Sequence, residues 1–195
     1  MSQNKHPGII ILAAGKGTRF IQAGGVGNKL MARYPDDRGN LQPLLALSLK
    51  HALDSGLPVR VVTRPQSGEL LDLLTRYPVS VTRLASPGSA DSIAAGVAAS
   101  SDWDGWIIAP ADMAWIAPQD YLQIAAALTE PLSQARMEWQ GQPGHPVGFG
   151  SGWRSELLVL KGDSGARHLL QPQKLIRIAG SSGNLRDADL PAGPE

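Results

Sequence analysis

The sequence contains no cysteine, few aromatic residues and no long hydrophobic run. The absence of cysteine excludes a disulfide framework, a thiolate metal site and a thiol nucleophile, and it fits the reducing cytoplasm, where we expect this protein. The apolar run at residues 9–14 is too short to span a bilayer. The 18 basic and 17 acidic residues are spread along the chain without a basic block. We therefore expect neither a membrane nor a nucleic acid as a partner.

Short β-rich apolar runs alternate along the chain with longer segments of helical period. This alternation predicts an α/β fold with a mostly parallel sheet covered by helices. The expected strands are residues 8–12, 59–63, 79–84, 106–109 and 175–178. Residues 136–150 break the rhythm and predict a small antiparallel excursion, and residues 34–40 look like a hairpin. We expect one domain, residues 1–180, followed by a loop-rich tail, residues 181–195.

Helices are expected between the strands, with recognisable start and stop signals. Gly56 is a suitable residue just past the end of a helix expected at residues 44–53, and Pro118 suits the first turn of one expected at residues 119–128. Ser89 or Asp91 could cap the helix expected at residues 93–99. The expected helices are residues 44–53, 69–76, 93–99 and 119–128, with shorter candidates at residues 155–160 and 166–170.

The first strand leads into a glycine-rich, cationic loop, residues 12–19, which read Leu-Ala-Ala-Gly-Lys-Gly-Thr-Arg. Gly15 and Gly17 allow close backbone approach, so that amide N–H groups can converge on an anion, and Lys16 and Arg19 add positive charge. This pattern predicts phosphate binding. The loop lacks both the Walker pattern and the dinucleotide pattern, which disfavours an ATPase or a dinucleotide reader. A tight turn carrying surface cations is the structural alternative.

A second candidate loop follows the strand at residues 106–109, where Pro110 and Ala111 lead to Asp112. In open α/β sheets ligands bind outside the carboxyl ends of the strands, so this loop should meet the opening loop over one crevice. A carboxylate in that position could hold a hydrated Mg²⁺ together with substrate phosphates. Asp112 could also be a simple helix cap or turn residue.

Three further motifs complete a resemblance that covers most of the chain. They are residues 89–96 (Ser-Ala-Asp-Ser-Ile-Ala-Ala-Gly), 144–146 (Gly-His-Pro) and 162–167 (Gly-Asp-Ser-Gly-Ala-Arg). Together with the two loops they resemble the cofactor nucleotidyltransferases, closest to the molybdenum cofactor cytidylyltransferases and their guanylyltransferase relatives. The last two motifs are characteristic of the cytidylyl branch. The resemblance implies a three-layer αβα Rossmann-like nucleotidyltransferase fold.

The resemblance also implies roles for individual residues. The nucleotide-binding residues would be Leu12, Ala13, Ala14, Gly15, Lys16, Gly17, Thr18, Arg19, Lys29, Ser89 and Ser92. Lys16, Arg19, Lys29 and Asp112 would be catalytic. The metal, Mg²⁺ (or Mn²⁺), would be held by Asp112 and Asp187, and the acceptor by His145, Asp163 and Arg167.

The activity implied is transfer of CMP from CTP to a phosphorylated acceptor, with the molybdopterin cofactor favoured, and release of pyrophosphate. A transient contact with a molybdoenzyme or its chaperone would deliver the product. Guanylyl or other nucleotidyl transfer, for example to a sugar phosphate, is the alternative within enzymes. The long spacing from Arg19 to Lys29 keeps open a weakened protein that only binds nucleotide or cofactor.

Some of these residues also have a purely structural interpretation. His145, in a Gly-Pro turn, could bond the local backbone instead of a ligand. Asp163 and Arg167 could cap a helix and form an ion pair. Asp187, in a segment rich in glycine and proline, could simply be solvated.

Overall fold

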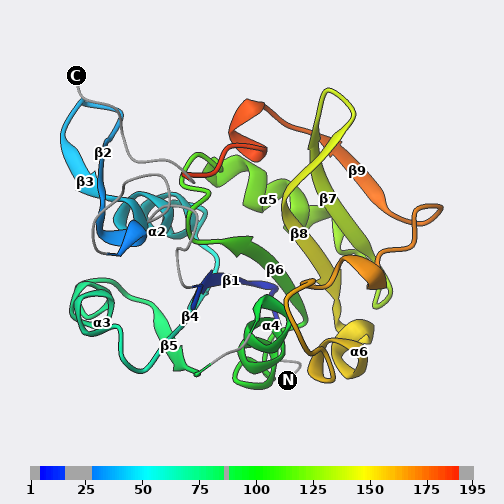
Figure 1. Ribbon diagram of the computed structural model, residues 1–195. Coiled ribbons are helices and arrows are strands. Elements are labelled where there is room, and N and C mark those ends of the chain that lie inside the picture. Colours follow the sequence, from blue (N-terminus) through cyan, green and yellow to red (C-terminus); the bar gives the residue numbers. More distant parts are fainter. Residues whose placement is uncertain (1–4, 16–27, 86–87, 189–195) are drawn as a thin grey trace.

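The computed structural model describes residues 5–15, 28–85 and 88–188 (Figure 1). Its centre is a seven-stranded sheet in the order β5-β4-β1-β6-β8-β7-β9, in which β8 alone among the described strands runs against its neighbours. The mostly parallel sheet predicted from the sequence is confirmed. The strands are β1 (Gly8–Ala13), β4 (Val59–Thr63), β5 (Ser80–Arg83), β6 (Gly105–Pro110), β7 (Gln134–Trp139), β8 (Gln142–Gly150) and β9 (Ile176–Ala179).

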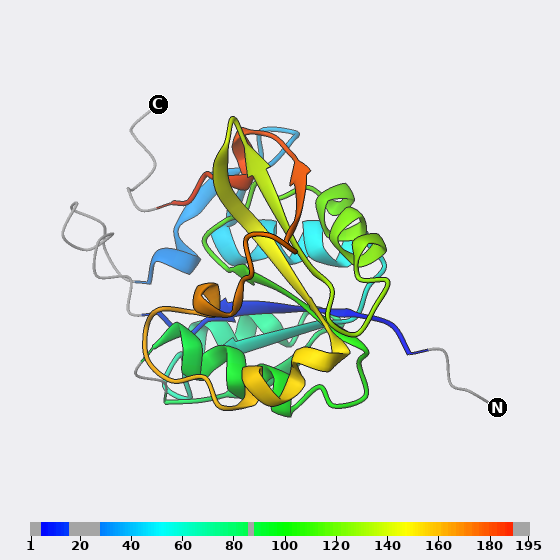
Figure 2. The same ribbon diagram turned by 90° about the vertical axis from the view of Figure 1, so that its right-hand side faces the viewer.

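Helices cover both faces of this sheet. The reason is visible in β1, where successive buried side chains belong alternately to two hydrophobic clusters. Ile9 and Ile11 belong to one buried cluster and Ile10 to another, because successive side chains of a strand point to opposite faces. Helices α2 and α5 pack on the first face, and α4 and α6 on the second (Figure 2). The predicted three-layer αβα architecture is therefore confirmed. The helices are α2 (Leu44–Asp54), α3 (Gly68–Leu74), α4 (Ser89–Ala98), α5 (Pro118–Ala127) and α6 (Arg154–Leu158).

The start of α4 corrects one prediction. The helix begins at Ser89, with Gly88 at the N-cap position, so neither Ser89 nor Asp91 caps it. Both side chains instead hold the loop at residues 162–163: the Ser89 hydroxyl donates to the carbonyl of Asp163, and the Asp91 carboxylate accepts from the N–H of Gly162. A tertiary contact has replaced the local capping interaction.

The helix predicted at residues 166–170 is also wrong. That stretch holds a single 3₁₀ turn, η3 (Arg167–Leu169). Gly165 precedes it with φ +59°, a left-handed conformation that an α-helix does not accommodate, and Leu170 is already extended. Too few residues remain between these two positions for an α-helix.

The predicted antiparallel excursion is the hairpin of β7 and β8. Its two turn residues, Gln140 and Gly141, both have positive φ, as a two-residue type I′ turn requires. A second hairpin pairs β2 (Arg33–Pro35) with β3 (Leu41–Pro43), and the Asp36 carboxylate accepts from the N–H groups of Arg38 and Asn40 inside its turn. Both expected hairpins are therefore present.

The segment after residue 180 packs against the sheet as far as the structure describes it. It forms a 3₁₀ turn, η4 (Ser182–Asn184), in which Asn184 is fully buried. The Asn184 side-chain amide donates to the carbonyl of His145 and to the carboxylate of Asp120. The domain boundary at residue 180 stays a prediction. None of the helices in the described ranges is long and apolar enough to cross a membrane.

Candidate functional site

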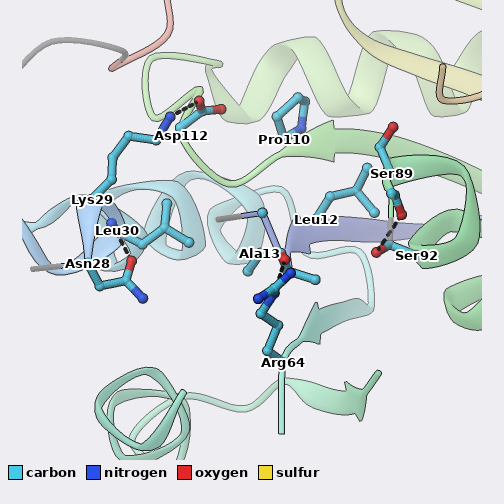
Figure 3. A pocket seen from close by; sticks show the side chains of 13 residues that line it. Leu12, Ala13, Asn28, Lys29, Leu30, Arg64, Ser89, Ser92, Pro110 and Asp112 are labelled. Atoms are coloured by element: carbon cyan, nitrogen blue, oxygen red, sulfur yellow. Dashed lines mark hydrogen bonds and ion pairs between the residues drawn. The ribbon is translucent and has the colours of Figure 1, made fainter. Parts of the chain in front are cut away.

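A cavity of about 390 Å³ opens where the carboxyl ends of β1 and β6 lie side by side (Figure 3). This is the position at which parallel α/β sheets bind ligands. Predicted nucleotide and metal residues line it: Leu12, Ala13, Ala14, Gly15, Lys29, Ser89, Ser92 and Asp112. The predictions for Lys16, Gly17, Thr18 and Arg19 fall outside the described residues.

An ion pair between Lys29 and Asp112 lies in this cavity. The Lys29 ammonium is 2.7 Å from an Asp112 carboxylate oxygen, and the two side chains are only 12% and 19% exposed. Lys29 opens the 3₁₀ turn η1 (Lys29–Met31), which Asn28 caps by accepting the N–H of Leu30. Lys29 reaches from there to Asp112 beyond the end of β6 (Figure 3). A carboxylate accepts at about four sites, so this ion pair still allows Asp112 to ligate a cation.

The loop that carries Asp112 is fixed by helix α2. The Ser48 hydroxyl donates to the carbonyl of Ala111, and His51 Nδ1 donates to the carbonyl of Ala114 over 2.8 Å. Ser48 and His51 are three residues apart and so lie on one face of the helix. Ala111 also donates its N–H to the carbonyl of Leu12, 2.9 Å away. The Asp112 loop is thus tied both to α2 and to the end of β1.

The residues near Asp112 fit a hydrated divalent cation. Asp187 follows Arg186, whose guanidinium stacks 3.5 Å from the ring centre of Trp115, and precedes Ala188, which is buried in the same cluster as Ala111. These contacts bring the backbone of Asp187 toward the Asp112 loop. The described residues contain no group of three metal-ligating side chains. One or two carboxylates with substrate phosphates are, however, a usual ligand set for Mg²⁺.

A second cavity of about 460 Å³ adjoins the first. The two share Leu12, Ser89 and Pro110 as a common wall. The three predicted acceptor residues, His145, Asp163 and Arg167, all line the second cavity, with Asp163 and Arg167 exposed to solvent. The structure therefore brings the two predicted groups of ligand residues into adjoining cavities.

At Ser89, a residue of this common wall, the start of α4 closely approaches the loop at residues 162–163. The N–H of Ala90 donates to the carbonyl of Gly162 over 2.9 Å, and the Ser89 hydroxyl donates to the carbonyl of Asp163 over 3.0 Å. A Cβ atom at Gly88 would collide with the carbonyl of Gly162. Gly88 is therefore required for the start of α4 to approach the loop at 162–163 this closely.

The surroundings of His145 in the second cavity disfavour its protonated form. Burial lowers the pKa of its imidazole, the Asp112 carboxylate opposes that shift, and the Arg136 guanidinium reinforces it. Its Nδ1 atom is shielded from water and has no hydrogen-bond partner within the described ranges, and the same holds for Arg136 Nε. Each buried polar atom left without a partner costs about 1–3 kcal/mol. Hydrogen-bond partners for these two atoms would remove that cost.

Sequence analysis missed two arginines in these cavities. Arg64 follows β4 and lines the first cavity, where its Nε donates to the carbonyl of Ala14 over 2.7 Å. The signal was present, because Arg64 comes directly after a buried strand beside β1. Arg136 lines the second cavity from the middle of β7, where a charged residue gives no comparable signal.

The fold and the paired cavities define an α/β protein of the nucleotide-binding type. The sequence model described as the MobA-like NTP transferase domain matches residues 9–178, so the chain belongs to the MobA-like NTP transferase family and is a nucleotidyltransferase.

Other proteins are similar to this chain in sequence or in fold. The purine catabolism protein PucB of Bacillus subtilis is 33% identical over 198 residues, which cover 93% of this chain and 91% of PucB. Rv0371c of Mycobacterium tuberculosis H37Rv shares the fold with a TM-score of 0.80 at 18% identity, covering 96% of this chain and 94% of its own, and it has also been solved in complex with manganese. A nucleotidyl transferase from Methanothermobacter thermautotroptrophicus, Mth528, has a TM-score of 0.80 at 21% identity. The match covers 96% of this chain and 93% of Mth528.

Proposed function

We propose that the protein transfers CMP from CTP to a phosphorylated acceptor, with the molybdopterin cofactor favoured, and releases pyrophosphate in the cytoplasm. The observation that carries the proposal is the common wall between the two cavities. Residues of the nucleotide motifs line one cavity and residues of the Gly-His-Pro and Gly-Asp-Ser-Gly-Ala-Arg motifs line the other. A donor phosphate and an acceptor phosphate can therefore meet at Ser89 and Pro110.

In this reaction an acceptor phosphate oxygen attacks the α-phosphorus of CTP. The new bond joins that oxygen to the α-phosphorus, and the bond from the α-phosphorus to the bridging oxygen of the β-phosphate breaks, so the electron pair leaves with pyrophosphate. The Gly15 amide together with Lys16, Gly17, Thr18 and Arg19 would hold the β- and γ-phosphates. Positioning and charge neutralisation supply most of the catalysis in such transfers.

Lys29 and Asp112 would act where charge builds up during the transfer. Lys29 would exchange its contact with Asp112 for one with the nucleotide. It would then donate to oxygens of the α-phosphate as the charge of that phosphate is redistributed. Mg²⁺ or Mn²⁺ held by Asp112 and Asp187 would supply further charge neutralisation. Arg64, beside Ala14, would keep the opening loop in place.

The acceptor needs no general base. A phosphate monoester has a second pKa of about 6, so its attacking oxygen is largely ionised near neutral pH. His145, whose pKa is lowered by burial, is correspondingly better suited to a neutral contact with the acceptor than to proton transfer. Asp163 and Arg167 at the open side of the cavity would contact the polar groups of the acceptor, and a molybdoenzyme or its chaperone would collect the product.

The proposal is tested by incubating the purified protein with CTP, Mg²⁺ and molybdenum cofactor and following pyrophosphate release. We expect multiple turnovers that depend on both substrates and on Asp112. A parallel series with GTP, ATP and UTP, and with sugar phosphates as acceptors, measures the preference for base and acceptor. Nucleotide binding by calorimetry without turnover on any acceptor would instead identify a protein that only binds, and it would overturn the proposal.

A further inference from the structure

The polar wall of the second cavity is built around Arg136, a residue that no motif singled out. Its Nη2 donates to the Glu138 carboxylate over 2.8 Å, and Arg177 of β9 lies 3.5 Å from the same carboxylate oxygen. Arg136 is 17% exposed and lines the cavity, whereas Arg177 is 52% exposed and is not one of its lining residues. Glu138 thus anchors Arg136 in the wall through Nη2.

A bulge in β8 puts His145 on the same wall. Arg136 pairs with Val147 and Glu138 pairs with Pro143, so a four-residue step on β8 faces a two-residue step on β7. Such bulges redirect side chains and are frequent beside active sites. The backbone of the bulge is fixed from behind, because the Asn184 amide donates to the carbonyl of His145 over 2.9 Å.

Arg136 and His145 each hold one shielded polar atom without a hydrogen-bond partner, among cavity residues that are mostly apolar. Arg136 Nε is a donor, and Nδ1 of a neutral imidazole protonated on Nε2 is an acceptor; neither has a partner among residues 5–15, 28–85 and 88–188. Most of their neighbours around the cavity offer no hydrogen bonds from their side chains: Ile93, Pro143, Val147, Phe149 and Leu170. A ligand that satisfies both atoms therefore needs an acceptor and a donor side by side on an otherwise apolar body.

We infer that Arg136 and His145 together recognise a lactam edge, a ring carbonyl adjacent to a ring N–H, on the acceptor substrate. The carbonyl oxygen accepts from Arg136 Nε, and the ring N–H donates to His145 Nδ1, after both side chains turn these shielded atoms toward the cavity that they line. This inference rests on the proposed function, since it concerns the ring that the acceptor places in the second cavity. Arg136 thereby becomes a specificity-determining residue.

The lactam edge occurs both in 4-oxopteridines and in 6-oxopurines, and binding measurements separate these sources. The probes are 6-hydroxymethylpterin and 2,4-diamino-6-hydroxymethylpteridine, which exchanges the carbonyl for an amino group and the ring N–H for an acceptor. We expect calorimetry at pH 8 to show at least about tenfold tighter binding of the oxo compound, because the diamino compound sets donor against donor and acceptor against acceptor. Hypoxanthine against adenine forms the purine pair, and tighter binding of hypoxanthine than of the pterin would assign the edge to a purine.

Variants test whether Arg136 causes the preference for the oxo compound, measured as the ratio of the two dissociation constants. In Arg136→Met the preference for the oxo compound should fall to within about twofold, and Arg136→Lys, which keeps the charge and lacks Nε–H, should also lose most of it. Arg177→Gln removes the other arginine at Glu138 and should keep the full ratio. The ratio between two ligands of nearly equal size is insensitive to a purely structural loss, which would weaken both equally.

Several outcomes would overturn the inference. They are equal binding of both members of each pair to the wild type, no detectable binding of any of the four compounds, or an unchanged ratio in both Arg136 variants. CMP transfer measured on the same preparations keeps the proposed function separate. Transfer to molybdenum cofactor without ring discrimination would remove the inference alone, and discrimination without transfer to any acceptor would remove the proposed function alone.

Discussion

The two cavities differ in how the protein builds them. The first is formed at the ends of parallel strands. The Asp112 loop is fixed there by the Ala111 N–H, which donates to β1, and by two loop carbonyls, which accept from side chains of α2. The second is formed by side chains on an antiparallel pair of strands and by the loop at residues 162–167. The first arrangement suits phosphates, which all nucleotides share, and the second suits a substrate that differs between members of a family.

The two cavities also differ in how far their charged side chains are buried. Lys29 and Asp112 are mostly shielded, so their charges act on a ligand with little screening by water. Asp163 and Arg167 are exposed, and the shielded charge of the second cavity is Arg136. Exposed charges contribute less to binding than shielded ones. We therefore propose that the reaction takes place in the first cavity and that the second cavity selects the acceptor.

Replacement of Asp112 tests the first half of this division and should have the largest effect. Asp112→Asn removes the carboxylate proposed to bind the metal. We expect turnover to fall about a thousandfold, which corresponds to about 4 kcal/mol of transition-state stabilisation. Pyrophosphate release at saturating CTP and Mg²⁺ measures the change. The matched control is Asp54→Asn, because Asp54 forms an ion pair of the same 2.7 Å length with Lys50 on the exposed surface of α2. Turnover within tenfold of the wild type in Asp112→Asn would contradict the role of Asp112.

Gly88→Ala should damage the wall that the two cavities share. The added Cβ would collide with the carbonyl of Gly162, so the start of α4 and the loop at 162–163 would have to separate. We expect a loss of about 1–3 kcal/mol in the free energy of unfolding and higher KM values for both substrates. Gly68→Ala is the control, since its Cβ would enter open space. A variant in which only one KM rises would show that the cavities are not coupled through this wall.

The first cavity could be predicted from the sequence far better than the second. A buried apolar strand followed by Gly15, or by Pro110 and Asp112, marks a strand end, and parallel strand ends meet at one edge of the sheet. The need for glycine at residue 88 and the bulge at His145 depend on contacts with residues 162 and 184, which are distant in sequence. The same reason explains the wrong capping prediction for Ser89 and Asp91, since local patterns contain no information on which loop will reach a helix start.

Loss of the contact between His51 and the Asp112 loop should have a smaller effect, confined to the first cavity. In His51→Ala the carbonyl of Ala114 loses its donor, and a hydrogen bond of this kind contributes about 0.5–1.5 kcal/mol. We expect the apparent KM for Mg²⁺ to rise about fivefold while the KM of the acceptor is unchanged. His51→Asn, whose amide nitrogen can take the place of Nδ1, should restore the wild-type value. A rise in the acceptor KM alone would contradict a role in positioning Asp112.

The smallest expected effect is a pH dependence of stability that originates at His145 in the second cavity. Because burial lowers the pKa of His145 in the folded protein, the unfolded chain takes up its proton more readily below the usual histidine value of about 6.5. The contribution of His145 to the free energy of unfolding is therefore constant above about pH 6.5. It falls as the pH decreases from there toward the pKa of His145 in the folded protein. Replacement by glutamine removes this penalty, so the stability difference between wild type and His145→Gln should shift in favour of the variant between pH 7.5 and pH 5. Urea denaturation of both proteins at the two pH values measures it, and a difference that stays constant would show that His145 titrates alike in the folded and unfolded chains.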